Sequence, residues 1–215
     1  MKLELDIADF DKAVQNYQSF YKAIDEVLYE LPRQYPGHSL KENIIVKLNI
    51  IGKTYDTGIA RAIKTKGDPG SSMTQLENHF WNNREFIDGL FNELSGITAP
   101  LEPQKLEQIV KLHGLLLRNI MKITRKNRRP RSFVSKYMHF HCPEVPIYDS
   151  YASEIMTSLV HWNDDIEIFD IPSGADEWYW DYSMRFYELY HTIRKQRPDA
   201  TVKLVDCYLL WEASD

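Results

Sequence analysis

The feature that most constrains the fold is a spacing of three and four residues between apolar side chains, repeated along almost the whole chain. This spacing places the apolar side chains on one face of an α-helix. The nine glycines and ten prolines fall mostly between the periodic segments, whereas a turn-rich β architecture needs turn residues at short intervals. Residues 165–171 come closest to an alternating strand pattern. We therefore predict an all-α fold.

The periodicity and its punctuation by capping residues, Gly and Pro predict about eight to nine helices. Pro32 and the Pro36-Gly37 pair mark the end of the first helix. Ser39 is then the predicted N-cap of the second helix, with Glu42 as its capping-box partner. A chain of 215 residues suits one domain over 1–215, or one domain in two helical lobes. The predicted helices are 9–31, a second containing 44–51, 54–64, 72–94, 103–124, 132–139, 150–160, 177–194 and 200–211.

The start of the sequence, its apolar runs and its two cysteines indicate where in the cell the protein is expected. The first six residues lack a basic segment followed by an apolar one, so no signal peptide is predicted. No apolar run approaches the roughly 18 residues of a membrane span. Cys142 and Cys207 are far apart in sequence, and without a secretory signal they are predicted to be free thiols. These features predict a cytoplasmic protein without a membrane partner.

Charge is unevenly distributed. The net charge of −5 argues against a protein whose main task is to grip a phosphate backbone. However, the segment 122–136 contains seven basic residues and no acid, whereas 137–184 contains ten acids and no Lys or Arg. This boundary predicts two opposed electrostatic faces, and the basic loop is a candidate contact for DNA or RNA. Its basic residues are Lys122, Arg125, Lys126, Arg128, Arg129, Arg131 and Lys136.

Residues 129–156 combine a basic loop, a short helix, a turn bounded by prolines and a second helix. The segments Ser132-Phe133-Val134-Ser135-Lys136 and Pro146-Ile147-Tyr148-Asp149-Ser150 resemble the core of the helix-hairpin-helix DNA glycosylase superfamily. The upstream segments 43–55 and 56–64 would take the place of its paired helices. The same run is also typical of an uncharacterised bacterial family, which implies no activity.

The resemblance implies base excision without lyase chemistry, because Arg131 and Ser132 stand near the place of the lysine nucleophile in bifunctional members. Asp149 would match the catalytic aspartate, which stabilises positive charge on the sugar and orients water. The residues implied to contact nucleic acid are Arg128, Arg129, Arg131, Ser132 and Lys136, and those implied to form a base pocket are Tyr148, Tyr151 and Trp162. One departure is the absence of glycine from 126–133, where the superfamily has hairpin glycines.

The same residues also have structural interpretations. Asp149 follows Pro146 and precedes a helix, so it is equally a predicted N-cap that accepts from the N–H groups of Tyr151 or Ala152. Lys136 is then a solvated side chain or the ion-pair partner of Glu144 or Asp149. The basic segment would be a solvated loop.

Two other functional classes remain open. In one, the chain is a non-enzymatic interaction module whose basic and acidic faces meet a protein partner. In the other, it is a small-molecule enzyme with a deep pocket lined by Tyr55, Asp56 and His139.

No cofactor is predicted, because the chain contains no Gly-x-Gly-x-x-Gly, Walker or metalloprotease motif. His139, His141 and Cys142 are potential metal ligands, but their spacing is not that of a structural zinc site, and no metal is predicted. The aromatic stretch 178–190 is predicted to be core, because aromatic side chains at helical spacing usually pack there. The alternative is a stacking platform for bases.

Overall fold

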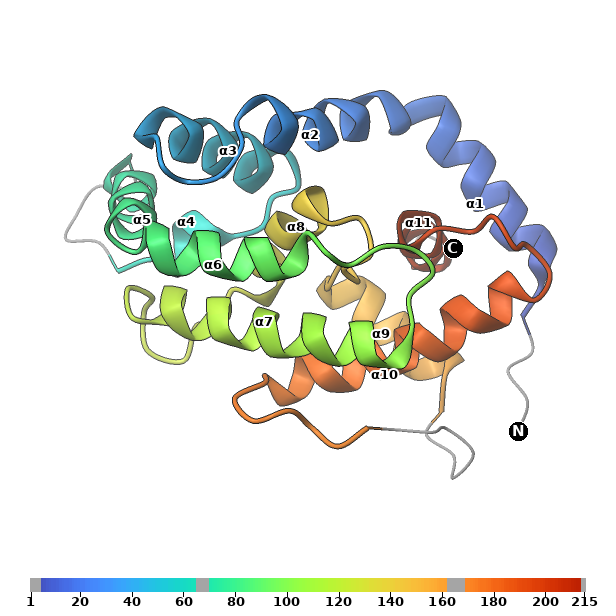
Figure 1. Cartoon of the computed structure of the whole chain (residues 1–215). Coiled ribbons are helices and arrows are strands. Elements are labelled where there is room, and N and C mark those ends of the chain that lie inside the picture. The colour runs from blue at the N-terminus through green and yellow to red at the C-terminus, as the bar shows by residue number, and fades with distance from the viewer. Residues whose placement is uncertain (1–4, 65–69, 162–168, 214–215) are drawn as a thin grey trace.

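The computed structural model describes residues 5–64, 70–161 and 169–213. Within these ranges the chain forms α-helices and no strand, which confirms the all-α prediction (Figure 1). The eleven helices of the described chain exceed the eight to nine predicted, because two long predicted helices are each divided. The helices are α1 (Ile7–Phe20), α2 (Lys22–Gln34), α3 (Lys41–Thr54), α4 (Ile59–Ala62), α5 (Gly70–Asn82), α6 (Arg84–Leu94), α7 (Pro103–Met121), α8 (Arg131–His141), α9 (Ser150–Leu159), α10 (Glu177–Arg194) and α11 (Val202–Glu212).

The predicted helix 9–31 is divided at Tyr21, which ends α1 and begins α2. Neither Gly nor Pro stands at this break, so no local signal predicts it. Instead, the two halves pack on different partners, α1 against α11 and α2 against α8. The predicted end at Pro32 is also wrong, since α2 continues past this residue to Gln34.

The predicted helix 72–94 is divided at Asn83. The side-chain amide of this residue donates to the carbonyl oxygen of His79 over 2.8 Å and so competes with the helical backbone pattern. The predicted capping box is absent, because α3 begins at Lys41 and its N-cap, Leu40, makes no side-chain hydrogen bond.

The predicted helix 54–64 is reduced to the single turn α4. Asp56 and Gly58 before it have positive φ angles of 39° and 66°, which interrupt a right-handed helix. After α4 the chain turns toward the loop that follows α7. Ile63 forms an isolated antiparallel bridge with Thr124, and the N–H of Lys64 donates to the carbonyl oxygen of Ile123 over 2.9 Å.

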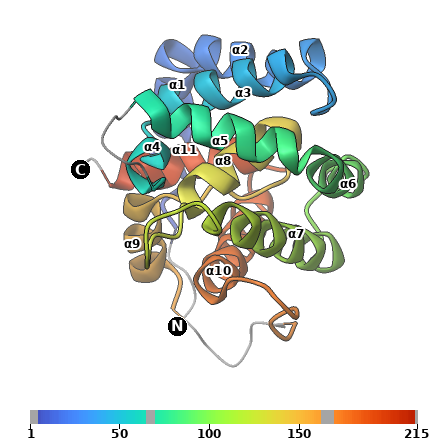
Figure 2. The same cartoon turned by 90° about the vertical axis from the view of Figure 1, so that its left-hand side faces the viewer.

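Helix α8 lies at the centre of the fold, as Figures 1 and 2 both show. It packs against α2, α3 and α7, and residues 133–140 are all buried. The helix therefore has no solvent-facing stripe beyond its first and last turns. This burial brings the polar residues on α8 into the interior, where each needs a partner.

Three further predictions can be compared with the described part of the chain. Cys142 and Cys207 are free thiols. None of the helices in the described ranges combines the length and the apolar character that crossing a membrane requires. The aromatic stretch on α10 is mostly core, as predicted. Its buried members are Tyr179, Tyr182, Phe186 and Tyr190.

Helix α7 approaches the segment before α10 so closely that Gly114 has no room for a side chain. A Cβ at this position would lie 2.4 Å from the carbonyl oxygen of Gly174 and 2.8 Å from the Cα of Ala175. Both neighbours are backbone atoms, which move only with their segment. The glycine therefore sets the position of Asp176, the N-cap of α10.

We expect Gly114→Ala to destabilise the protein by about 1–3 kcal/mol, because overpacking outweighs the gain in helix propensity. Gly89→Ala is the matched control. It lies within α6, nothing lies within 4 Å of its added Cβ, and the change should stabilise by roughly 0.5–1 kcal/mol. Urea unfolding of both variants measures the difference. Two shifts of the same sign would contradict the close approach of α7.

Candidate functional site

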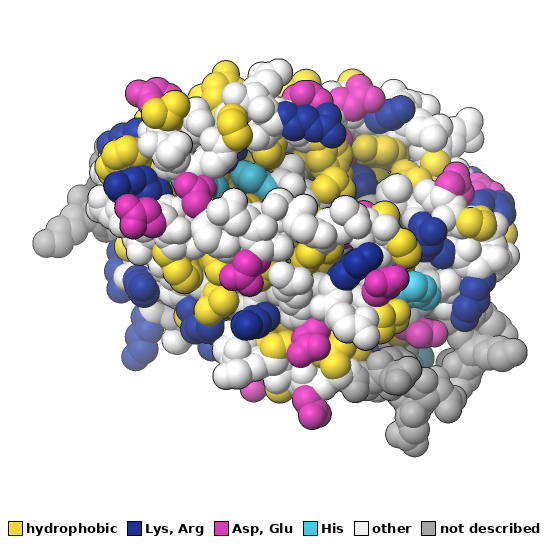
Figure 3. All heavy atoms as spheres, viewed as in Figure 1, with side chains coloured by type: hydrophobic (Ala, Val, Ile, Leu, Met, Phe, Trp, Pro, Cys, Tyr) yellow, Lys and Arg dark blue, Asp and Glu magenta, His cyan; other side chains and the backbone are white. Residues whose placement is uncertain are grey.

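The loop between α7 and α8 presents the basic residues to solvent. The structure holds this loop in place, because the N–H of Arg125 donates to the carbonyl oxygen of Ala62 over 2.8 Å, next to the bridge between Ile63 and Thr124. Figure 3 shows Lys and Arg side chains gathered at the end of the molecule where α7 ends. The exposed basic residues of the loop are Lys122, Arg125, Lys126, Arg128 and Arg129.

Two arginines at the end of the loop are fixed by one buried carboxylate. Asp176 is only 4% exposed. It accepts from Arg129 over 2.9 Å and from Arg131 over 2.5 and 3.1 Å. It also caps α10 by accepting from the N–H of Tyr179. Burial raises the pKa of Asp176, but the hydrogen bonds and charges of Arg131 and Arg129 outweigh burial and hold the pKa below its usual 3.8.

A polar pocket of about 490 Å³ opens beside this ion pair. Trp178 forms part of its wall and is 66% exposed. The guanidinium carbon of Arg131 lies 5.4 Å from the centroid of the tryptophan ring, in a cation–π contact. The pocket is lined by Asn127, Arg128, Arg129, Arg131, Glu177 and Trp178.

The remaining two residues of the predicted nucleic-acid interface lie on α8. Ser132 is half-buried in the first turn of the helix, close to the basic loop. Lys136 is buried, and its Nζ lies 3.0 Å from Oδ2 of Asp149. The structure thus places Arg128 and Arg129 at the surface, leaves Arg131 and Ser132 partly buried, and turns Lys136 toward the interior.

Asp149 caps α9, as its position after Pro146 predicts. Its Oδ1 accepts from the N–H of Tyr151 over 3.1 Å, while its Oδ2 takes the ion pair with Lys136. Each carboxylate oxygen therefore has a partner. The side chain keeps 22% of its surface exposed, so solvent still reaches it.

The three aromatic residues of the predicted base pocket have different surroundings. Tyr148 is partly buried and packs edge-to-face on Tyr182, with centroids 5.2 Å apart. Tyr151 is 67% exposed. Trp162 lies outside the described residues. Neither Tyr148 nor Tyr151 lines the polar pocket beside Trp178.

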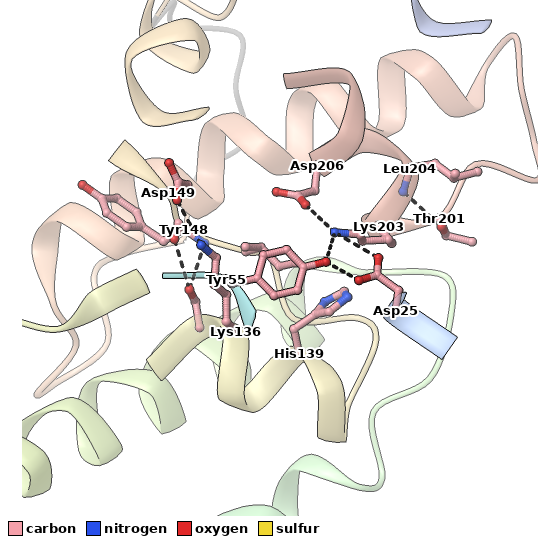
Figure 4. A network of polar contacts seen from close by, with 12 residues as sticks. Asp25, Tyr55, Lys136, His139, Tyr148, Asp149, Thr201, Lys203, Leu204 and Asp206 are labelled. Carbon is pink, nitrogen blue, oxygen red and sulfur yellow. Dashed lines mark hydrogen bonds and ion pairs between the residues drawn. The ribbon is translucent and has the colours of Figure 1, made fainter. Parts of the chain in front are cut away.

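A second polar cluster, which we call the buried ionic cluster, consists of Asp25, Tyr55, Lys203 and Asp206 (Figure 4). The Nζ of Lys203 lies 3.0 Å from Oδ2 of Asp206, 3.3 Å from Oδ2 of Asp25 and 3.3 Å from the hydroxyl of Tyr55. The same hydroxyl donates to Oδ1 of Asp25. The two carboxylates and Lys203 are each at most 7% exposed.

The buried ionic cluster and the ion pair of Asp149 meet at Tyr55. The Nζ of Lys136 lies 5.3 Å from the centroid of the Tyr55 ring, and the Nζ of Lys203 lies 5.1 Å from it. Two ammonium groups, each paired with a carboxylate, therefore lie near the ring of Tyr55. Burial lowers the pKa of Lys203, but the negative charges of Asp206 and Asp25 outweigh burial and hold the pKa well above its usual range.

His139 lies beside the buried ionic cluster with a defined tautomer. Its Nδ1 lies 2.8 Å from the carbonyl oxygen of Val145, which can only accept, so Nδ1 carries the proton. Its Nε2 therefore accepts from the hydroxyl of Tyr29 over 2.5 Å. Burial, and then the charge of Lys203, lower the pKa of His139 to about 3. The ring is neutral at pH 7.

Two pockets flank Lys203 and share Tyr17 as a wall. One, of about 590 Å³, lies between α2 and α11, and the other, of about 330 Å³, lies between α1 and α11. Tyr55 lines the second pocket, as the small-molecule interpretation expects, but His139 is buried behind Tyr29 and Asp56 is exposed. The geometry therefore assembles only one of those three residues into a pocket.

Sequence reasoning missed the buried ionic cluster and Asp176. A signal for the cluster exists, because Asp25 interrupts the apolar face formed by Tyr21 and Leu28, and Lys203 and Asp206 interrupt the most apolar helix. Asp176 precedes α10 as a typical N-cap. Its pairing with the basic loop, 45 and 47 residues away, requires the tertiary fold.

The predicted separation into two charged faces is replaced, at these positions, by direct pairing. Asp176 pairs with both Arg129 and Arg131, and Asp149 pairs with Lys136. The exposed charge that remains on the loop is therefore concentrated in its first part, around Lys122, Lys126 and Arg128.

The potential metal ligands His139, His141 and Cys142 do not converge. Over the described ranges, no group of three or more His, Cys, Asp or Glu side chains is placed to hold a metal ion. The chain matches no protein-family model, no curated protein and no solved structure.

Proposed function

We propose that this protein binds nucleic acid through the basic loop 122–131. The observation that carries the proposal is the exposure of consecutive basic side chains on a loop without an acid, held by backbone pairing with the segment after α4. A loop fixed in this way presents its charges without a large ordering cost on binding. Neutralising phosphates with such residues releases counterions and supplies most of the affinity in sequence-independent binding.

The start of α8 supports the same assignment. The N-cap position is Pro130, which makes no side-chain hydrogen bond to the first turn. Helix N–H groups without a capping side chain attract anions, and the helix dipole adds to the attraction. Ser132 stands in this first turn, next to the arginines. We infer that α8, the turn that follows it and α9 together act like the core of a helix-hairpin-helix protein.

Within this proposal, binding is favoured over base excision. A catalytic carboxylate must be able to meet the sugar and the attacking water. Both oxygens of Asp149 already have partners, Lys136 and the N–H of Tyr151. Asp149→Asn, tested on uracil- and hypoxanthine-containing strands, separates the two cases, because loss of base release in this variant alone would assign catalysis to Asp149.

The binding test is a salt series with labelled single-stranded and duplex DNA and RNA. We expect the triple change of Lys122, Lys126 and Arg128 to Ala to weaken binding and to reduce the slope of log K against log salt by about 2 to 3, since each phosphate contact contributes roughly 0.7–0.9. These three residues are exposed, and none is part of the Asp176 ion pair, so the fold should remain intact.

The matched control changes Lys22, Lys53 and Lys195 to Ala. These residues are also exposed and lie on other helices or helix ends. The control alters the net charge equally but should leave the slope unchanged. Equal effects of the two triple variants would show that only net charge matters. No binding of the wild-type protein at low salt would refute the proposal.

A second candidate function is an interaction module, favoured by one observation. At the junction of α1 and α2, neighbouring large apolar side chains point to solvent, and exposed apolar patches of this kind often mark interfaces. These residues are Phe20, Tyr21, Ile24 and Val27. This function would become the first candidate if the nucleic-acid test failed.

A further inference from the structure

Trp178 departs from the rest of the aromatic stretch on α10. Its neighbours Tyr179 and Tyr182 are buried, as core residues are, whereas Trp178 is 66% exposed. A tryptophan left largely in water does not contribute its apolar surface to the core. Instead, the ring forms part of the wall of the polar pocket beside Arg128 and Arg129, where a ligand could contact it.

The exposed ring contacts an arginine that is itself restrained. Asp176 is buried and anchors Arg131 with two hydrogen bonds. The guanidinium of Arg131 in turn lies against the ring of Trp178. Because Arg131 is itself restrained, this contact favours one placement of the ring, which reduces the conformational entropy that binding costs.

The pocket has two chemically distinct sides. The loop side presents Arg128 and Arg129, which suit a phosphate, and the α10 side presents Trp178 and Glu177. A carboxylate repels phosphate but accepts hydrogen bonds from the amino groups of bases. The three arginines, set against Asp176 and Glu177, leave one net positive charge (3 − 2 = 1). The volume of about 490 Å³ is within the range of small-ligand sites.

We propose that this pocket binds one unpaired nucleotide of a single strand, with its base stacked on Trp178 and its phosphate on Arg128 and Arg129. The inference rests on the proposed nucleic-acid function and narrows its substrate to single-stranded or locally unpaired strands. Within a duplex, a base is stacked on both faces and cannot meet the ring. A single strand offers every base as a π-surface.

The test measures binding of a labelled mixed-sequence 12-nucleotide strand and of its duplex, at one salt concentration, to wild type, Trp178→Ala and Trp178→Phe. We expect Trp178→Ala to bind the single strand about 5- to 150-fold more weakly, the range for loss of one stacked base. Trp178→Phe should retain most of the affinity because it keeps an aromatic face. Duplex binding should change less than about twofold in both variants.

Phe20→Ala is the matched control, because it also removes an exposed aromatic ring, at 73% exposure, far along the chain from the basic loop. It should bind both ligands as wild type does. If Trp178→Ala binds the single strand like wild type, the stacking inference is overturned while the binding proposal stands. Equal losses for single strand and duplex would also overturn it. If wild type binds neither ligand, the proposed function itself fails.

Discussion

Between pH 7 and pH 5 the protein is expected to lose a large part of its stability. Three histidines, His38, His113 and His139, have no exposed surface. Burial is the largest cause that lowers their pKa values, to about 4 for His38 and about 3 for the other two. The charge of Lys203 also lowers the pKa of His139. The charge of Lys47 also lowers the pKa of His38, and these effects outweigh Asp88, whose carboxylate lies 2.8 Å from Nδ1 of His38 and raises the pKa.

The direction of the effect follows from proton binding. In the unfolded chain these histidines titrate near the ordinary pKa of 6.5, so below that pH the unfolded state binds more protons than the folded state. Stability is therefore fully present above pH 6.5 and falls as the pH decreases toward the folded pKa values of 3 to 4. Each group contributes about 1.4 kcal/mol per pH unit. These three groups and His141, whose pKa burial also holds well below its ordinary value, give about 8 kcal/mol over 1.5 pH units, against a typical total of roughly 5–15 kcal/mol.

His113 illustrates why burial dominates. Its ring stacks on that of Tyr179, with centroids 3.6 Å apart and planes 14° from parallel. Neither ring nitrogen has a hydrogen-bond partner within the described chain. Burial lowers the pKa of this ring more than the nearby carboxylate of Asp176 raises it, so the folded state excludes the proton.

The measurement is urea unfolding at half-unit steps from pH 8 to pH 4.5. The slope of the unfolding free energy below pH 6.5 should correspond to about four protons, because burial also holds the pKa of His141 well below its ordinary value. His161→Gln, at an exposed position, should leave the slope unchanged, whereas His139→Gln should reduce it by about one proton. A flat profile down to pH 5 would mean that these rings are not kept neutral by the fold.

The sequence predicted the helices best where the periodic segment had clear ends. The helix at 177–194 has the predicted bounds, because Asp176 caps its start and no competing contact divides it. The breaks at Tyr21 and Asn83 were not predicted. They arise from packing on separate partners and from a side-chain amide bond to the backbone, neither of which changes the apolar spacing.

In the candidate site, too, local contacts were predicted and contacts between distant segments were not. The cap at Asp149 and its ion pair with Lys136 were among the predicted alternatives, because both residues lie within one local motif. The pairing of Asp176 with the basic loop and the burial of Asp25 beside Lys203 were not. These contacts join residues 45 to 178 positions apart, and local patterns carry no information on which distant helices will meet.

Lys203→Met is expected to destabilise the protein by about 3–5 kcal/mol, the range for removing one partner of a buried ion pair. The ammonium group is the shared cation of Asp25 and Asp206, and both carboxylates are 1% exposed. Without it, two buried negative charges face each other and Tyr55 without compensation. For a chain of this length, the loss corresponds to a decrease in Tm of roughly 6–20 °C.

Two further variants separate lost charge compensation from lost packing. Lys195→Met, on an exposed position after α10, should change Tm by less than about 2 °C, because surface substitutions seldom exceed 0.5 kcal/mol. The double variant Lys203→Met/Asp206→Asn removes one of the two stranded charges and should be more stable than Lys203→Met alone. If the double variant is instead less stable than Lys203→Met, Lys203 contributes by packing, and charge compensation does not explain the stability of this cluster. Recovery in the double variant would show that the charges of Asp25 and Asp206 are held in the interior by this one ammonium group.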